Sequence, residues 1–121
     1  MGLPSSTHQS SATAVKNLGA YISLHTDASA TQITGSDEVT GGSYTRKLGT
    51  WDAGAWNSGQ GRFIFTSSEV NIPCPAGTVK GGGIYSAASS GTFVGSDQFT
   101  GGPVIVSGTN GSIDVTAQVK A

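Results

Sequence analysis

The two residues best placed for acid–base chemistry are His25 and Asp27, which lie in the run Leu24-His25-Thr26-Asp27. A histidine can act as a general base when a carboxylate orients its ring. The Gly-x-Ser-x-Gly turn that exposes a nucleophilic serine in many hydrolases is absent from the chain. A small hydrolase using His25 and Asp27 is one hypothesis, but we favour a histidine at a strand end beside a turn-forming aspartate. We therefore predict no catalytic residue.

The residues that could bind a metal ion do not form a recognisable motif. His8, His25 and Cys74 are far apart in the sequence, and there is no Cys-x-x-Cys pair. Asp37 and Glu38 are adjacent, so on a strand their side chains would point to opposite faces. We expect no metal site.

The glycine-rich runs 59–61 and 81–83 do not match the patterns that bind phosphates or dinucleotides. They indicate special backbone geometry, and we predict no cofactor. Cys74 is the only cysteine, which excludes an internal disulfide. It lies between two prolines with no base or positive charge near it in sequence, so we expect a small buried residue and not a reactive thiol.

Three aromatic residues, Tyr44, Trp51 and Trp56, could stack on sugar rings or on a protein partner. We expect at least one tryptophan to pack in the core. Trp56 lies in a glycine-rich segment predicted as a loop over residues 52–60, so it is the stronger candidate for a contact residue.

The charge of the chain argues against several classes of partner. The formal net charge is −1, and only 11% of the residues are charged. The basic residues are scattered and form no patch that could bind a phosphate backbone, so we expect no nucleic-acid partner. No run approaches the roughly 20 apolar residues of a membrane span, and no secretory signal is recognisable, so we expect no membrane partner.

The elements that hold these residues are predicted to be strands, because 19 of the 121 residues are glycine. Glycine inside a helix costs about 1 kcal/mol relative to alanine, whereas turns and bulges use it readily. We predict an extended N-terminal arm over residues 1–8, a short helix over 9–18 capped by Gly19, and a single β domain over 9–121. The expected fold class is an all-β antiparallel sandwich or open barrel with one short N-terminal helix.

About eight short strands are expected. The clearest covers residues 112–120, where apolar and polar residues alternate, which indicates one buried face. Asn110-Gly111 precedes it and predicts a tight hairpin with the strand over 104–106. The other predicted strands cover residues 20–25, 44–51, 62–65, 70–72, 78–85 and 91–98.

Large apolar side chains are few, because much of the 36% hydrophobic fraction is alanine. We therefore expect a thin core and additional burial through self-association or docking onto a larger surface.

Two ordered segments resemble a family of small virion proteins of tailed bacteriophages. The first runs from Ala20 to Asp27 and contains Tyr21-Ile22-Ser23-Leu24-His25-Thr26. The second runs from Asp37 to Arg46 and contains Glu38-Val39, Gly41-Gly42 and Tyr44. A later segment over residues 84–93 adds to the similarity, which extends over residues 12–119. The family has a proline shortly after the first segment, and this chain lacks it, so the loop after Asp27 departs from the pattern.

The resemblance implies a non-enzymatic structural protein on the exterior of the virion, assembled in the bacterial host cytoplasm. We expect a capsid decoration protein, since no repetitive shaft is present; the alternative is a minor tail or tail-fibre protein that contacts the host surface. Expected partners are further copies of the chain, as a homotrimer, and the major capsid protein, or else tail proteins or a host glycan. The candidate interface residues are Leu3, Pro4, Tyr44, Arg46 and Trp56.

Overall fold

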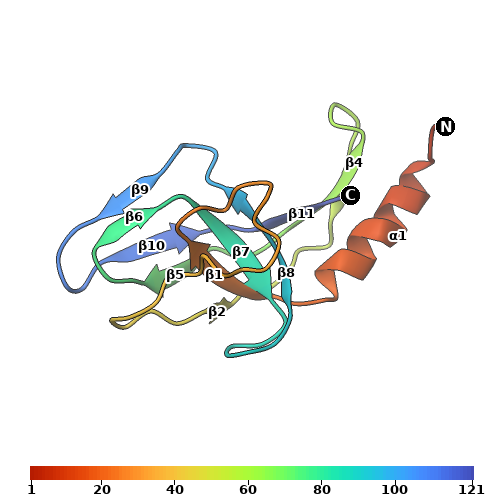
Figure 1. The fold of residues 1–121 in the computed structure, drawn as a ribbon. Helices are drawn as coiled ribbons and strands as arrows, with labels where there is room; N and C mark the ends of the chain where they lie inside the picture. Colours follow the sequence, from red (N-terminus) through yellow and green to blue (C-terminus); the bar gives the residue numbers. More distant parts are fainter.

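Short antiparallel strands are the main regular elements of the computed structural model, which describes residues 1–121 and contains one helix (Figure 1). This confirms the predicted all-β class with a helix near the N-terminus. The elements in chain order are α1 (Ser5–Lys16), β1 (Tyr21–His25), β2 (Lys47–Leu48), β3 (Ala55–Asn57), β4 (Arg62–Thr66), β5 (Val70–Pro73), β6 (Gly77–Val79), β7 (Gly81–Tyr85), β8 (Phe93–Gln98), β9 (Val104–Val106), β10 (Ser112–Val115) and β11 (Gln118–Lys120).

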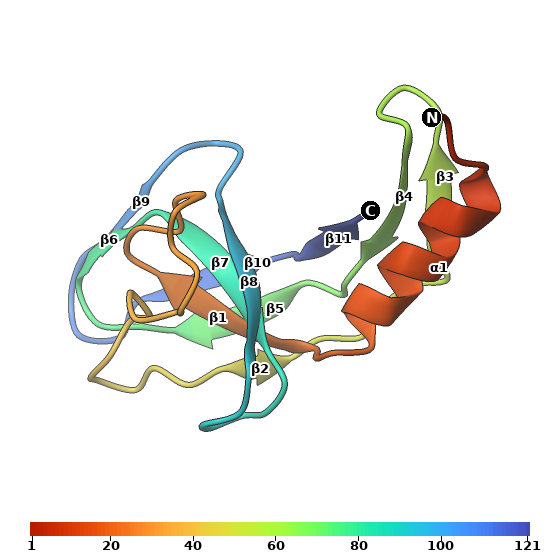
Figure 2. The same ribbon diagram turned by 45° about the vertical axis from the view of Figure 1, so that its right-hand side comes forward.

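The strands form four small sheets. The largest has the order β2-β1-β7-β8, and two pairs, β10-β5 and β6-β9, complete the body of the sandwich. The fourth sheet, β11-β4-β3, lies to one side, where α1 packs against β4 and β11 (Figure 2). The protein therefore has a main body around β1 and β7 and a smaller layer in which α1 covers β4.

The helix begins earlier than the sequence predicted. The carbonyl of Pro4 accepts hydrogen bonds from the backbone N–H groups of Thr7 and His8, at 3.0 and 3.3 Å. Proline is well suited to this position, because its fixed φ and missing N–H cost nothing at a helix start. The expected arm over residues 1–8 is thus extended only over residues 1–4. The predicted cap at Gly19 is also wrong, because the helix ends at Lys16 with Asn17 as its cap.

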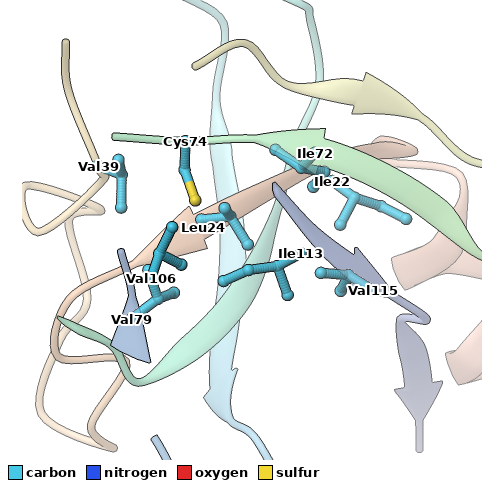
Figure 3. Packing of buried hydrophobic residues seen from close by; sticks show 9 residues of the cluster. All are labelled: Ile22, Leu24, Val39, Ile72, Cys74, Val79, Val106, Ile113 and Val115. Atoms are coloured by element: carbon cyan, nitrogen blue, oxygen red, sulfur yellow. The ribbon is translucent and has the colours of Figure 1, made fainter. Parts of the chain in front are cut away.

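The main core contains nine buried side chains, seven from strands and two, Val39 and Cys74, from connecting segments (Figure 3). Ile22, Leu24 and Ile72 are fully buried, and Cys74 is 1% exposed, as the sequence predicted for the cysteine. Fully burying one such aliphatic side chain stabilises the fold by about 1.5–3 kcal/mol. The whole cluster is Ile22, Leu24, Val39, Ile72, Cys74, Val79, Val106, Ile113 and Val115.

The alternating segment over residues 112–120 is confirmed in its burial pattern but is divided into two strands. Ile113 and Val115 on β10 enter the main core, whereas Val119 on β11 enters a second cluster with Phe63, Phe65, Ile84 and the helix residue Ala12. At the break between the strands, the hydroxyl oxygen of Ser67 accepts a hydrogen bond from the N–H of Ala117, at 2.9 Å. The apolar side chains of this segment are therefore divided between the main core and the second cluster.

The hairpin predicted at Asn110-Gly111 is wrong. β10 pairs with β5, and β9 pairs with β6, so the strands on either side of this dipeptide are not partners. The positive φ in this connection belongs to Gly108 instead, at 83°. Gly111 is needed for a close approach, because a Cβ there would lie 2.2 Å from Cγ1 of Val106.

Other strand boundaries also differ from the predictions. The segment over residues 44–51 contributes only the two-residue strand β2 and an isolated bridge between Trp51 and Ser67. The segment over residues 78–85 is divided between β6 and β7. The predicted loop over residues 52–60 contains β3, which places Trp56 on a strand at the edge of its sheet.

Candidate functional site

A chain of hydrogen bonds joins Ser23, His25 and Asp37. The Ser23 hydroxyl oxygen lies 2.7 Å from Nε2 of His25, and Nδ1 of His25 lies 3.1 Å from Oδ1 of Asp37. Because a carboxylate can only accept, we assign the Nδ1 proton to the bond with Asp37, so that Nε2 accepts from Ser23. The order serine–histidine–aspartate is that of a hydrolytic triad.

The carboxylate in this chain is Asp37, and not Asp27 as the sequence hypothesis proposed. Oδ2 of Asp37 also accepts hydrogen bonds from the backbone N–H groups of Ala28 and Asp27, at 2.8 and 3.2 Å. Burial raises the pKa of Asp37, but these hydrogen bonds and the contact with His25 outweigh it, so the pKa lies below its ordinary value. Asp37 therefore fastens the loop after β1 back onto that strand.

The serine and the histidine are closed off from any substrate. Ser23 and His25 are both completely buried. The ring of Tyr85 stacks on His25 with the centroids 6.1 Å apart, and Phe93 lies against it at 5.6 Å. The backbone of Gly83 is so close that a Cβ there would lie 2.5 Å from Nε2. A nucleophile must reach the atom that it attacks, so this geometry gives the three residues a structural role.

Burial on both faces of β1 also explains why the sequence did not reveal this arrangement. A strand over residues 20–25 was expected from the sequence, and in it Ile22 and Leu24 face one way and Ser23 and His25 the other. The polar face is as deeply buried as the apolar one. Asp37 is brought to this face by the loop that follows β1, where His25 forms a bridge with Glu38. No local sequence signal reports such a loop closure.

A second polar cluster joins Glu38, Tyr44 and Arg46. The guanidinium of Arg46 donates from Nε and Nη2 to the two carboxylate oxygens of Glu38, at 2.8 and 2.9 Å. The hydroxyl of Tyr44 donates to Oε2 of Glu38 at 2.5 Å and accepts from the N–H of Leu24 at 3.2 Å. Bidentate pairs of this kind are among the stronger polar contacts in proteins.

Arg46 also holds a second loop in place. Its Nη1 donates to the carbonyl oxygens of Ala87 and Ser90, at 2.9 and 2.7 Å, and its guanidinium carbon lies 3.5 Å from the centroid of the Tyr85 ring. The cluster thus connects the loop before β2 with the β7–β8 turn. Since the same ring of Tyr85 stacks on His25, the two polar clusters share one wall.

The ionisation of this cluster follows from its contacts. Burial raises the pKa of Glu38, but hydrogen bonds from Arg46 and Tyr44 outweigh it and hold the pKa below its usual range. The hydrogen bond to Glu38 raises the pKa of Arg46. Burial, followed by the bond to the Glu38 carboxylate, raises the pKa of Tyr44 far above its ordinary value. Glu38 and Arg46 are therefore a fixed ion pair at neutral pH.

Comparison with known proteins identifies the family. A family model described as podophage GP4 fiber I protein gp80 matches residues 7–119. The chain belongs to this family. No curated protein and no solved structure matches it. The resemblance to phage virion proteins is confirmed at this level, and gp80-type fibre proteins are structural components of the particle.

Among the candidate contact residues of this gp80-family chain, Leu3, Pro4 and Trp56 are exposed. Trp56 is 40% exposed on β3, and the ring of His8 lies against it with the centroids 5.2 Å apart. Tyr44 and Arg46 instead direct their polar atoms into the internal cluster described above. The interface role of all five candidate residues stays a prediction.

The fold of this gp80-family chain contains no group of three or more histidine, cysteine, aspartate or glutamate side chains that could hold a metal ion. Its one helix is too short and too polar to cross a membrane. Burial raises the pKa of the Cys74 thiol, which disfavours the reactive thiolate.

Proposed function

We propose that the chain is a non-enzymatic subunit of a phage fibre, assembled in the host cytoplasm and exposed on the exterior of the virion. The observation that carries this proposal is the family match over residues 7–119. The match names a fibre protein, so we place the tail-fibre alternative ahead of the capsid decoration that the sequence alone favoured.

The closed polar clusters support a structural role over a catalytic one. Of the three residues with the connectivity of a hydrolytic triad, Ser23 and His25 are completely buried, and Tyr85 and Phe93 lie against His25. The three together fasten a loop to β1. The Glu38–Arg46 cluster fastens two further loops. Loops fixed in this way present a rigid outer surface, which lowers the entropic cost of binding a partner.

A host glycan is the proposed ligand of the aromatic pair formed by the exposed Trp56 and the partly buried His8. An exposed indole offers an apolar face on which a sugar ring can stack. Trp56 lies on β3, at the edge of its sheet, and His8 reaches it from α1. If the pair contributes to host binding, phage carrying Trp56→Ala should adsorb more slowly than wild type. Leu48→Ala is the matched control, because Leu48 is also an exposed hydrophobic residue, on the short strand β2.

Adsorption of phage that lack the protein tests the proposal as a whole. We expect such particles to keep intact, filled heads but to adsorb poorly to host cells. Particles that adsorb normally but have fragile heads would instead support capsid decoration, with the major capsid protein as the partner. In that case the fibre proposal would be wrong.

A further inference from the structure

A groove of about 620 Å³ separates β8 from the strands β10 and β11. One wall is the continuous run over residues 94–100, and the other is the run over residues 115–120. Gly82, Gly83 and Ile84 of β7, with Ile22 of β1, also line it. The groove therefore lies between the largest sheet and the segment that connects the two cores.

Both walls are strand edges without a partner. β8 is the last strand of its sheet and pairs only with β7; β10 pairs only with β5, and β11 only with β4. A strand that pairs on one side presents a row of backbone N–H and C=O groups on the other. β8 has six residues and is about 20 Å long at roughly 3.3 Å per residue, enough to pair with a short strand from another chain.

Gly95 on the β8 wall favours such an occupant. It lines the groove, and a Cβ built on it would meet no atom within 4 Å, so the space beside it is open. An incoming strand can therefore approach β8 closely at this position without meeting a side chain.

The chain itself carries a strand of the matching kind. β9 pairs only with β6, and its residues Val104 and Ile105 are 37% and 79% exposed. Residues 101–113 contain no charged side chain, so nothing on this segment blocks the approach of another strand. An uncharged apolar strand can enter the groove without taking a charge out of water, which would be costly.

We propose that β9 of one copy inserts into the groove beside β8 of a second copy. The contact is an added strand: backbone hydrogen bonds join β9 to the free edge of β8, and Ile105 packs into the groove. In both views β9 lies at the end of the molecule away from β11, so donor and acceptor are different surfaces (Figures 1 and 2). Such a head-to-tail contact closes into a ring, for example a trimer, or continues as a filament.

Two variants separate the donor from the acceptor. Ile105→Asp places a charge on the donor strand, and Gly95→Arg fills the acceptor groove from a position where the side chain has room. Ile33→Asp is the control for the donor, since Ile33 is 80% exposed, like Ile105. Gly101→Arg is the control for the acceptor, since Gly101 also has open space and does not line the groove. Circular dichroism checks that each full-length variant is folded.

Sedimentation velocity over a concentration series measures assembly. We expect wild type and both controls to form the same oligomer. The dissociation constant of each test variant should be at least about 30-fold higher, as is typical when a central interface residue is lost. Each test variant keeps one intact surface, so an equimolar mixture of the two should form a dimer, which neither variant forms alone. A wild-type protein that is monomeric throughout, or an Ile105→Asp or Gly95→Arg variant that assembles like wild type, would overturn the inference.

The inference rests on the proposed function only in naming a fibre as the assembly that this contact builds. The strand contact and the proposed function can therefore be refuted separately. If the protein is a fibre component but Ile105→Asp assembles normally, the contact is wrong and the function stands. If the test variants behave as expected but phage without the protein adsorb normally, the function is wrong and the contact stands.

Discussion

Replacing Gly83 with alanine tests whether the buried histidine holds the fold together. A Cβ at this position would lie 2.5 Å from Nε2 of His25 and 2.9 Å from the carbonyl oxygen of Gly95. Both distances are below normal contact, and His25 cannot move away, because two hydrogen bonds and two aromatic rings fix it. Overpacking of a rigid site costs about 2–3 kcal/mol, the upper half of the usual range.

The net effect is smaller, because alanine also restricts the unfolded chain, which offsets about 1 kcal/mol. We therefore expect the free energy of unfolding to fall by about 1–2 kcal/mol. For 121 residues the unfolding entropy is about 0.25 kcal/mol/K, so each kcal/mol lowers Tm by about 4 °C. The expected decrease in Tm for Gly83→Ala is about 4–8 °C by calorimetry.

Gly95→Ala is the matched control. Gly95 lies on the adjacent strand of the same sheet, neither glycine has a positive φ, and the new methyl group at Gly95 would meet no atom. Its Tm should be unchanged or slightly higher. If Gly83→Ala were as stable as Gly95→Ala, the account of a rigid, enclosed histidine would be refuted.

Three further changes test the polar clusters and the core. Arg46→Lys keeps the charge but loses the bidentate pair with Glu38, and should lower the free energy of unfolding by about 1–3 kcal/mol in urea titrations. The control is Arg62→Lys, at an exposed position, which should change the free energy of unfolding by less than about 0.5 kcal/mol. Folding lowers the pKa of Asp37, so its ionised carboxylate stabilises the folded state fully at pH values above the unfolded pKa, near 3.8. This stabilisation is lost as the pH falls through the folded pKa. In Asp37→Asn this part of the acid-induced decrease in Tm should be absent. Ile72→Ala removes a fully buried side chain from the main core and should cost about 2–5 kcal/mol, which chemical denaturation would detect.

Much of the local structure followed from the sequence. The alternation over residues 112–120 predicted which side chains are buried, and the strand from Tyr21 to His25 lies where it was expected. These features depend on the period of the side chains along a strand, which is a property of the segment itself.

The failures concern contacts between segments that are distant in the chain. Asn110-Gly111 has the composition of a tight turn, but the strand after it finds its partner in β5, about 40 residues earlier, and the close approach of Val106 explains Gly111. Asp37 reaches His25 only when the intervening loop closes. The turn preference of a dipeptide contributes little free energy compared with the burial of a whole strand face. Tertiary packing therefore determines which strands pair.

The sequence did not reveal the internal contacts of the motif residues Tyr44 and Arg46, and the interface role predicted for them stays a prediction. In the fold they connect Glu38 to the β7–β8 turn. The segments that carry the family resemblance therefore describe internal supports of the loops, whereas the exposed apolar residues Trp56 and Ile105 lie outside them.

Electron microscopy of virions with a gold-labelled antibody against this protein tests the central claim most directly. Phage that lack the protein provide the control for antibody specificity. A fibre subunit predicts label on the appendages of the tail and none over the shell of the head. Label distributed evenly over the head, or no label on the particle exterior, would contradict the account.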